Sequence, residues 1–176
     1  MRIVAGAFRG RQLKSPTWDG LRPTSDRLRE TLFNILGPSV RGARVLDGYA
    51  GTGAIGIEAL SRGAADVTFV EQDPRAAKLI EANLAALGAS GAIIRAGFAE
   101  AASRLGGQVF DLIILDPPYA DGGAAEALGA AHALAGERTR LVVEHAARHA
   151  APPEHGGLRL TRTVKAGDSA LSFYER

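Results

Sequence analysis

The sequence contains no cysteine, and this absence excludes several kinds of protein. Without thiols there is no disulfide framework, no zinc site built from thiolates and no cysteine nucleophile. Long apolar runs are missing as well, so the sequence predicts no transmembrane helix. The apolar stretch at residues 1–6 is too short for a secretory signal. Together these absences predict a soluble, cytoplasmic protein that has no membrane association.

The length and composition fit one globular domain with a sizeable core. The chain has 176 residues, of which 46% are apolar and 23% are charged. It shows no internal repeat, low-complexity tract or long linker. We therefore expect one main domain at residues 21–176, preceded by a short basic appendage at residues 1–20.

The positive charge is concentrated at the amino end. Residues 1–44 contain nine Lys or Arg and three acidic residues, a balance of +6 that leaves −4 on the remainder. A basic end on an otherwise acidic domain favours a polyanionic partner that approaches from one side. A solvated surface of charges is the more common explanation of such a pattern when charge is considered alone.

Hydrophobic periodicity predicts an α/β fold. Residues 2–14 indicate a small hairpin, and residues 28–36 have the apolar spacing of a helix, with Thr24, Ser25 or Asp26 as its N-cap. Strands are predicted at 43–47, 67–71, 92–96, 110–116 and 140–144, and helices at 54–62, 74–87, 98–105 and 122–134. Such alternation is typical of a parallel sheet with helices on both faces. Residues 158–165 and 169–176 add a hairpin, so we expect a Rossmann-like, mostly parallel seven-stranded sheet with an antiparallel C-terminal hairpin strand.

A glycine-rich loop directly follows the first predicted strand of this domain. Glycines 51, 53 and 56 have the spacing of a loop whose backbone closely approaches a nucleotide-like ligand. Glu71 ends the next strand, where its carboxylate can accept hydrogen bonds from two ribose hydroxyls. The pattern fits both NAD and S-adenosylmethionine. Asp47 favours S-adenosylmethionine, because a carboxylate suits a cationic aminoacyl group and repels a pyrophosphate.

The sequence Asp116-Pro117-Pro118-Tyr119 follows the fourth predicted strand, at the position of the ligand crevice in an open α/β sheet. The Asp116 carboxylate and the Pro117 carbonyl can each accept one hydrogen of an amine, which holds the nitrogen ready to meet an electrophilic methyl carbon. Pro118 stiffens the loop, and Tyr119 offers a ring on which a base can stack. This segment predicts methyl transfer to the amine of a planar substrate.

These motifs resemble the Rossmann-like, class I S-adenosylmethionine-dependent methyltransferases that modify exocyclic amines. Residues 21–36 and 56–64 are similar to the 16S ribosomal RNA guanine-N2 methyltransferase D family, as are residues 2–6 and 167–171. The resemblance runs nearly end to end. It implies direct methyl transfer from S-adenosylmethionine to the N2 amine of a guanine in 16S ribosomal RNA, either free or within an assembled small subunit, with no metal and no obligate protein partner.

The resemblance also implies roles for individual residues. The expected catalytic set is Asp116, Pro117, Pro118 and Tyr119. The expected cofactor-binding set is Asp47, Tyr49, Ala50, Gly51, Gly53, Glu71 and Gln72, with Asp47, Gly51 and Gly53 around the methionine part. The expected RNA-contacting set is Arg9, Arg11, Arg22, Thr24, Arg27 and Arg29.

The chain departs from the family pattern at two places. Gly48 stands where the family usually has a bulky apolar residue. The family commonly has an acidic residue near Gly97-Phe98 that contacts the adenine amine, and neither of these two positions is acidic here. Three other functions stay open: N6-adenine methylation of nucleic acid, protein-glutamine methylation, and a non-methylating NAD-binding module, which would leave residues 116–119 unexplained.

Overall fold

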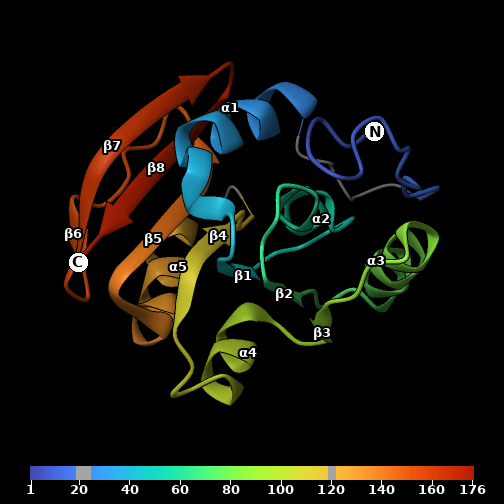
Figure 1. Ribbon diagram of the computed structural model, residues 1–176. Coiled ribbons are helices and arrows are strands. Elements are labelled where there is room, and N and C mark those ends of the chain that lie inside the picture. The colour runs from blue at the N-terminus through green and yellow to red at the C-terminus, as the bar shows by residue number, and fades with distance from the viewer. Residues whose placement is uncertain (19–24, 119–121) are drawn as a thin grey trace.

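The computed structural model describes residues 1–18, 25–118 and 122–176. Eight strands form one sheet in the spatial order β3-β2-β1-β4-β5-β8-β7-β6 (Figure 1). They are β1 (Arg44–Asp47), β2 (Asp66–Val70), β3 (Ala92–Ile94), β4 (Phe110–Leu115), β5 (Ala135–Ala146), β6 (Glu154–His155), β7 (Leu158–Ala166) and β8 (Ser169–Glu175). β1 to β5 are parallel, whereas β8, β7 and β6 continue the sheet with antiparallel pairing. The predicted α/β architecture is confirmed, and the two-residue β6 is an eighth strand that the sequence did not predict.

Helices cover both faces of the sheet. Successive strand residues point to opposite sides, so each face has its own apolar side chains to bury. In β1, Val45 packs into one core cluster and Leu46 into the other, and both are fully buried. Helices α1, α2 and α3 contribute to the first cluster, and α4 and α5 contribute to the second. The helices are α1 (Asp26–Leu36), α2 (Ala54–Ser61), α3 (Pro74–Leu87), α4 (Phe98–Arg104) and α5 (Gly123–Ala131), with 3-10 turns η1 (Gly37–Val40) and η2 (His132–Leu134). Within the described ranges, no helix is both long and apolar enough to cross a membrane.

β5 begins at residue 135, five residues before the predicted start at residue 140. The helix predicted at 122–134 is α-helical only as far as Ala131 and continues as the 3-10 turn η2. The exposed charges of Glu137 and Arg138 hide the strand pattern in the sequence. Thr139 anchors this half of β5, because its hydroxyl donates to the Phe110 carbonyl at 2.5 Å and accepts from the Gly136 N–H at 2.8 Å. A register irregularity between Phe110 and Leu112 accommodates the extra length.

The start of α1 follows from one of the three predicted caps. The Ser25 hydroxyl accepts the Leu28 N–H at 3.1 Å, so Ser25 is the N-cap. This bond satisfies one of the donors that a helix leaves without an intrahelical partner at its N-terminus. Thr24 lies outside the described residues.

The amino-terminal segment packs against the body of the domain. Arg2 and Gln12 form an isolated antiparallel bridge, and the Ile3 N–H donates to the Arg11 carbonyl at 3.0 Å, so residues 2–14 form a small hairpin with a single bridge. Left-handed turns at Gly6 and Gly10 take up the residues that a longer ladder would need. Ile3 and Leu13 are buried in the core cluster that includes α1 and α2. The loop thus has little freedom to move independently of α2.

Candidate active site

A cavity of about 840 Å³ lies at the carboxyl ends of β1, β2 and β4. This is the place where an open parallel sheet binds ligands, and the volume is within the range of small-molecule sites, about 300–1,000 Å³. The predicted site residues that line it are Arg27, Tyr49, Ala50, Gly51, Glu71, Gln72, Asp116, Pro117 and Pro118. Two distant motifs, the glycine loop and residues 116–118, therefore share one cavity. Tyr119 lies outside the described residues.

The glycine loop turns sharply from β1 into α2. Gly51 and Gly53 adopt left-handed backbone conformations, with φ of 53° and 77°, which side chains rarely tolerate. Gly56 allows α2 to approach the sheet closely, since a Cβ there would lie 2.2 Å from the Phe69 ring. The loop backbone is anchored to the neighbouring strand by the Ala50 N–H, which donates to the Val70 carbonyl at 2.9 Å.

Glu71 follows β2 and holds the glycine loop in place. Its Oε2 accepts the Gly51 N–H at 2.7 Å, and its Oε1 accepts the Asp73 N–H at 2.7 Å. A carboxylate has about four lone-pair positions, so two backbone donors leave acceptor capacity on a residue that lines the cavity. The sequence predicted a ribose contact for Glu71. It did not predict the two hydrogen bonds by which Glu71 links the glycine loop to the turn after β2.

Asp47, the last residue of β1, holds the glycine loop in place through a hydrogen bond to α2. Its side chain is buried, and its Oδ2 accepts the Gly56 N–H at 2.9 Å in the first turn of α2. The pKa of Asp47 is raised to about 7, and burial is the largest cause. The Gly56 hydrogen bond opposes this rise, whereas the nearby charge of Glu71 adds to it. Asp47 is not among the residues that line the cavity. One oxygen of the Asp47 carboxylate thus binds the helix backbone beside the cavity, and a role of Asp47 around the methionine part of a cofactor stays a prediction.

Asp116 and the two prolines extend from the end of β4 into the cavity wall. The Gly48 N–H donates to the Ile114 carbonyl at 2.8 Å, which ties the glycine loop to β4 two residues before Asp116. Asp116 is half-buried, Pro117 is buried and Pro118 is exposed. The carboxylate therefore lies beside the glycine loop at a partly shielded position.

Aromatic rings form the apolar side of the cavity. Tyr49 and Phe98 both line it, and their ring centroids are 5.1 Å apart. Burial, and secondarily the charge of Glu126, raise the pKa of Tyr49 to about 12, so its hydroxyl stays protonated at neutral pH. A Cβ on Gly48 would lie 2.3 Å from the Leu115 side chain and 2.8 Å from Phe98. Leu115 and Phe98 thus occupy the space into which a larger residue at position 48 would project.

Trp18 and Arg75 also line this cavity, and the sequence assigned neither to it. The Arg75 guanidinium lies over the Trp18 ring, 5.0 Å from its centroid. A tryptophan in a loop can stack on a base or anchor the loop on the core, and no local pattern distinguishes the two. In the part of the chain that the structure describes, no group of three or more His, Cys, Asp or Glu is placed to hold a metal ion.

Comparison with known proteins establishes the family. A family model described as Conserved hypothetical protein 95 matches residues 1–175. The Escherichia coli (strain K12) protein named Ribosomal RNA small subunit methyltransferase D is 36% identical over 178 residues, which cover 100% of this chain and 90% of that protein. The chain belongs to the ribosomal RNA small subunit methyltransferase D family.

Solved structures agree with this family. An E. coli structure described as a candidate methyltransferase, yhhF, has a TM-score of 0.89 and 35% identity, and the match covers 100% of this chain and 97% of that chain. A Thermus thermophilus structure, described as the 16S rRNA N2 G1207 methyltransferase (RsmC) in complex with AdoMet and guanosine, has a TM-score of 0.71 and 27% identity. That match covers 91% of this chain and 44% of the larger chain. The predicted class I methyltransferase fold is thereby confirmed.

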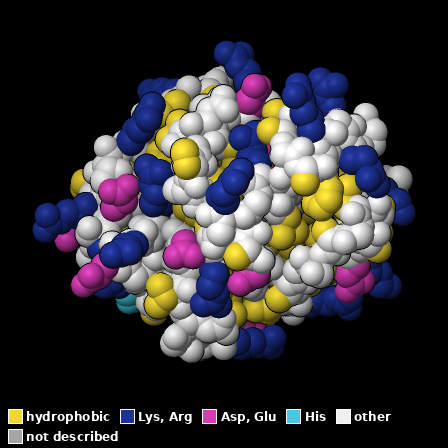
Figure 2. Space-filling view, in the orientation of Figure 1, with side chains coloured by type: hydrophobic (Ala, Val, Ile, Leu, Met, Phe, Trp, Pro, Cys, Tyr) yellow, Lys and Arg dark blue, Asp and Glu magenta, His cyan; other side chains and the backbone are white. Residues whose placement is uncertain are grey.

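The basic residues predicted to contact RNA lie in different environments in this family member. Arg9, Arg11 and Arg27 are exposed, Arg27 lines the cavity, and an Arg11 Nη donates to the Ala86 carbonyl at 2.7 Å. Lys and Arg side chains are spread over the face seen in Figure 2. Arg22 lies, like Thr24, outside the described residues.

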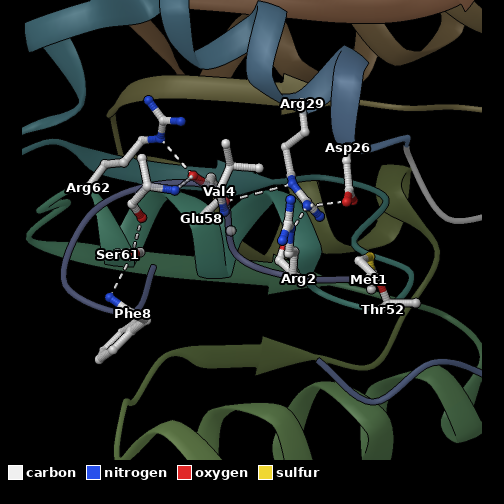
Figure 3. Close-up of polar contacts among 12 residues, drawn as sticks. Met1, Arg2, Val4, Phe8, Asp26, Arg29, Thr52, Glu58, Ser61 and Arg62 are labelled. Atoms are coloured by element: carbon white, nitrogen blue, oxygen red, sulfur yellow. Dashed lines mark hydrogen bonds and ion pairs between the residues drawn. The ribbon is translucent and has the colours of Figure 1, made fainter. Parts of the chain in front are cut away.

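Arg29 is the exception, since its side chain is fully buried and cannot reach RNA in this conformation. An Nη of Arg29 donates to the Arg2 carbonyl at 2.5 Å and to Asp26 at 2.9 Å, and its Nε lies 3.8 Å from Glu58 (Figure 3). The expectation that Arg29 contacts RNA is therefore corrected. Arg29 instead links α1 to the amino-terminal loop.

Glu58 connects that loop to α2, although nothing in its local sequence singled it out. Its two carboxylate oxygens accept the backbone N–H groups of Val4 at 2.8 Å and Ala5 at 3.0 Å (Figure 3). Arg62, one turn later, donates to the same carboxylate at 2.8 Å. A buried carboxylate is stable when it is paired and hydrogen-bonded in this way. The contacts fix the loop that carries Arg9 and Arg11.

Proposed function

We propose that this protein transfers a methyl group from S-adenosylmethionine to the N2 amine of a guanine in 16S ribosomal RNA. The observation that carries the proposal is that Asp116 and Pro117 line the same cavity as the glycine loop and Glu71. An acceptor pair for an amine and a nucleoside-binding loop are thus adjacent. The names of the E. coli relative and of the T. thermophilus neighbour support ribosomal RNA as the substrate class.

The cavity residues fit S-adenosylmethionine. Glu71 accepts the ribose hydroxyls with the lone pairs that Gly51 and Asp73 leave available. Gly51 brings backbone close to the methionine part, while Gly53 and Asp47 hold the loop in position. Phe98 supplies an apolar surface for the adenine, and no contact to the adenine amine is assigned. When bound, S-adenosylmethionine supplies an electrophilic methyl carbon on a sulfonium, which is a good leaving group.

Asp116 and Pro117 position the guanine amine for attack. The Asp116 carboxylate and the Pro117 carbonyl each accept one hydrogen of the N2 amine, so its lone pair is directed at the methyl carbon. Alignment of this kind supplies much of a catalytic rate, because it removes the entropic cost of bringing the reactants together. Formation of the nitrogen–carbon bond would break the bond between the methyl carbon and sulfur, so that S-adenosylhomocysteine would leave. The nitrogen would then lose a proton to Asp116 or to water. Tyr119 is proposed to stack on the guanine after the base leaves its own stack.

Residues 1–20 are proposed to face the RNA, while residues 21–176 carry the chemistry. Arg9, Arg11 and Arg27 are exposed and suited to phosphate contacts, and we add Arg22 and Thr24 from the sequence. The RNA substrate is proposed to be either free 16S ribosomal RNA or the assembled small subunit. Work on ribosomal RNA implies a cytoplasmic location.

A methylation assay tests this proposal. Purified protein is incubated with methyl-labelled S-adenosylmethionine and with free 16S RNA or small subunits from cells that lack the gene. The RNA is then digested to nucleosides. The expected label is in N2-methylguanosine. Label in N6-methyladenosine, or in protein glutamine, would replace the proposed substrate with one of the two rivals, and tight binding of NAD without that of S-adenosylhomocysteine would indicate a non-methylating module.

A further inference from the structure

Glu144 is a further carboxylate in the cavity wall, and the proposed mechanism does not use it. It lies near the end of β5 and is only 6% exposed. It lines the cavity described above and also a neighbouring pocket of about 280 Å³. Pro117 and Pro118 line both spaces as well. Glu144 and the two prolines therefore form a wall shared by the two pockets.

The strand register places Glu144 beside Asp116. In the parallel pairing of β4 with β5, Ile114 pairs with Val142 and Leu115 pairs with Val143. The next positions are Asp116, which directly follows the last residue of β4, and Glu144 in β5. Ile114 and Val142 both pack into the first core cluster, and side chains two residues apart share a face of a strand. The two carboxylates are thus neighbours on the same side of the sheet, and both line the cavity.

The donors of guanine match two adjacent carboxylates. The Watson–Crick edge of guanine presents the N2 amine and, next to it, the N1–H, whereas N1 of adenine is an acceptor. A flipped base is read through hydrogen bonds to this edge. With the N2 amine on Asp116 and Pro117, the N1–H is directed to a neighbouring acceptor. A carboxylate offers only acceptors when it is ionised, so it pairs with guanine N1–H and repels an N1 lone pair.

We propose that Glu144 accepts the N1–H of the target guanine and thereby makes the enzyme specific for guanine over other purines that carry an amine. The proposal rests on the proposed guanine-N2 function of the same site. Glu144 is a specificity-determining residue, while Asp116 and Pro117 hold the reacting nitrogen. A site built to bond one polar group rejects analogues that lack it by about 10⁴- to 10⁵-fold, because its own polar group is left unpaired.

The purine 2,6-diaminopurine separates the two roles. It keeps the amine at position 2 but has an acceptor at N1 in place of the guanine N1–H. The experiment compares two RNA substrates that contain either guanine or 2,6-diaminopurine at the mapped target position, and it measures kcat/KM for each with the same protein. The parent is expected to prefer guanine by at least about 100-fold, well within such discrimination.

Glu144→Gln tests the assignment directly, because an amide can donate a hydrogen bond to the N1 acceptor of 2,6-diaminopurine. The guanine preference is expected to fall at least tenfold, through a lower rate on guanine and a higher rate on 2,6-diaminopurine. Glu144→Asp keeps a carboxylate and is expected to lose rate but to retain the guanine preference. Glu137→Gln, an exposed position near the start of β5, is the matched control and should leave the ratio unchanged.

The ratio of the two rates is the deciding quantity, since partial loss of folded protein lowers both rates equally. An unchanged ratio in Glu144→Gln, or a ratio lost to the same extent in Glu144→Asp, would overturn the role of Glu144 while guanine methylation by the parent still stands. A parent that does not methylate the guanine RNA at all would overturn the proposed function and this inference together.

Discussion

The Glu71 carboxylate accepts the Gly51 backbone N–H at 2.7 Å, although twenty positions separate the two residues. The same carboxylate accepts the Asp73 N–H at 2.7 Å. One side chain thereby fixes the loop after β1 and the turn after β2. Because the proposed function also gives this carboxylate the ribose contact, cofactor affinity and loop geometry are expected to depend on the same group.

Glu71→Ala is expected to weaken cofactor binding more than the chemical step. The variant loses the ribose acceptor and also the acceptor that holds Gly51. Hydrogen bonds to charged groups contribute about 1.5–3 kcal/mol each, so the Kd for S-adenosylhomocysteine should rise at least tenfold. Isothermal titration calorimetry measures this, with Glu81→Ala on the exposed side of α3 as the control. Equal affinity in the variant and the parent would show that the ribose is held elsewhere.

Asp47→Asn is expected to change how stability depends on pH. Burial raises the pKa of Asp47 from 3.8 to about 7 in the folded protein, so the folded state holds a proton that the unfolded state releases. The contribution of Asp47 to the free energy of unfolding therefore falls as pH rises from about 4 to 7. Asparagine lacks this titration but can still accept the Gly56 N–H. Urea unfolding of both proteins across this range should show the variant gaining stability relative to the parent, and parallel curves would contradict the raised pKa.

Asp116→Ala is expected to abolish methyl transfer while cofactor affinity stays within a few-fold of the parent. An interaction made mainly with the reacting amine lowers kcat without an equal loss of ground-state binding. Asp116→Asn keeps one carbonyl acceptor and should fall between alanine and the parent. Retention of more than about a tenth of the parent rate by the alanine variant, a deficit below about 1.4 kcal/mol, would remove Asp116 from the reacting centre.

Replacing both Arg9 and Arg11 with alanine is expected to weaken RNA binding and its dependence on salt. Each neutralised phosphate adds about 0.7–0.9 to the slope of log affinity against log salt concentration, so the slope should flatten by about one to two. Cofactor affinity should hardly change, because neither residue lines the cavity. An identical slope in parent and variant would mean that RNA docks elsewhere, with exposed Arg27 on α1 as the next residue to test.

Much of the fold could be predicted because its signals are local. The alternation of strands and helices, the glycine spacing and the prolines after Asp116 each lie within a few consecutive residues. The cap of α1 is less distinctive, because three consecutive residues at 24–26 are all suitable, and only the observed bond to Leu28 identifies Ser25.

The features that could not be predicted depend on contacts between segments that are far apart in the sequence. Arg29 is buried against Glu58, 29 positions later, and no local pattern distinguishes it from the exposed Arg27 on the same helix. Glu144 stands beside Asp116 only through the register of β4 and β5. Asp47 has the position expected of a ligand contact, and its hydrogen bond to the Gly56 N–H, nine positions later in α2, has no signal in the neighbouring residues.

Mapping modified nucleosides in cells tests whether this enzyme methylates the N2 amine of a guanine in 16S ribosomal RNA, as proposed. Small-subunit RNA is isolated from cells with and without the gene, and modified positions are mapped by mass spectrometry of nuclease fragments. One N2-methylguanine is expected to disappear without the gene, to return with the parent gene and not to return with Asp116→Ala. An unchanged set of N2-methylguanines, or loss of a methyladenine instead, would contradict the proposed function.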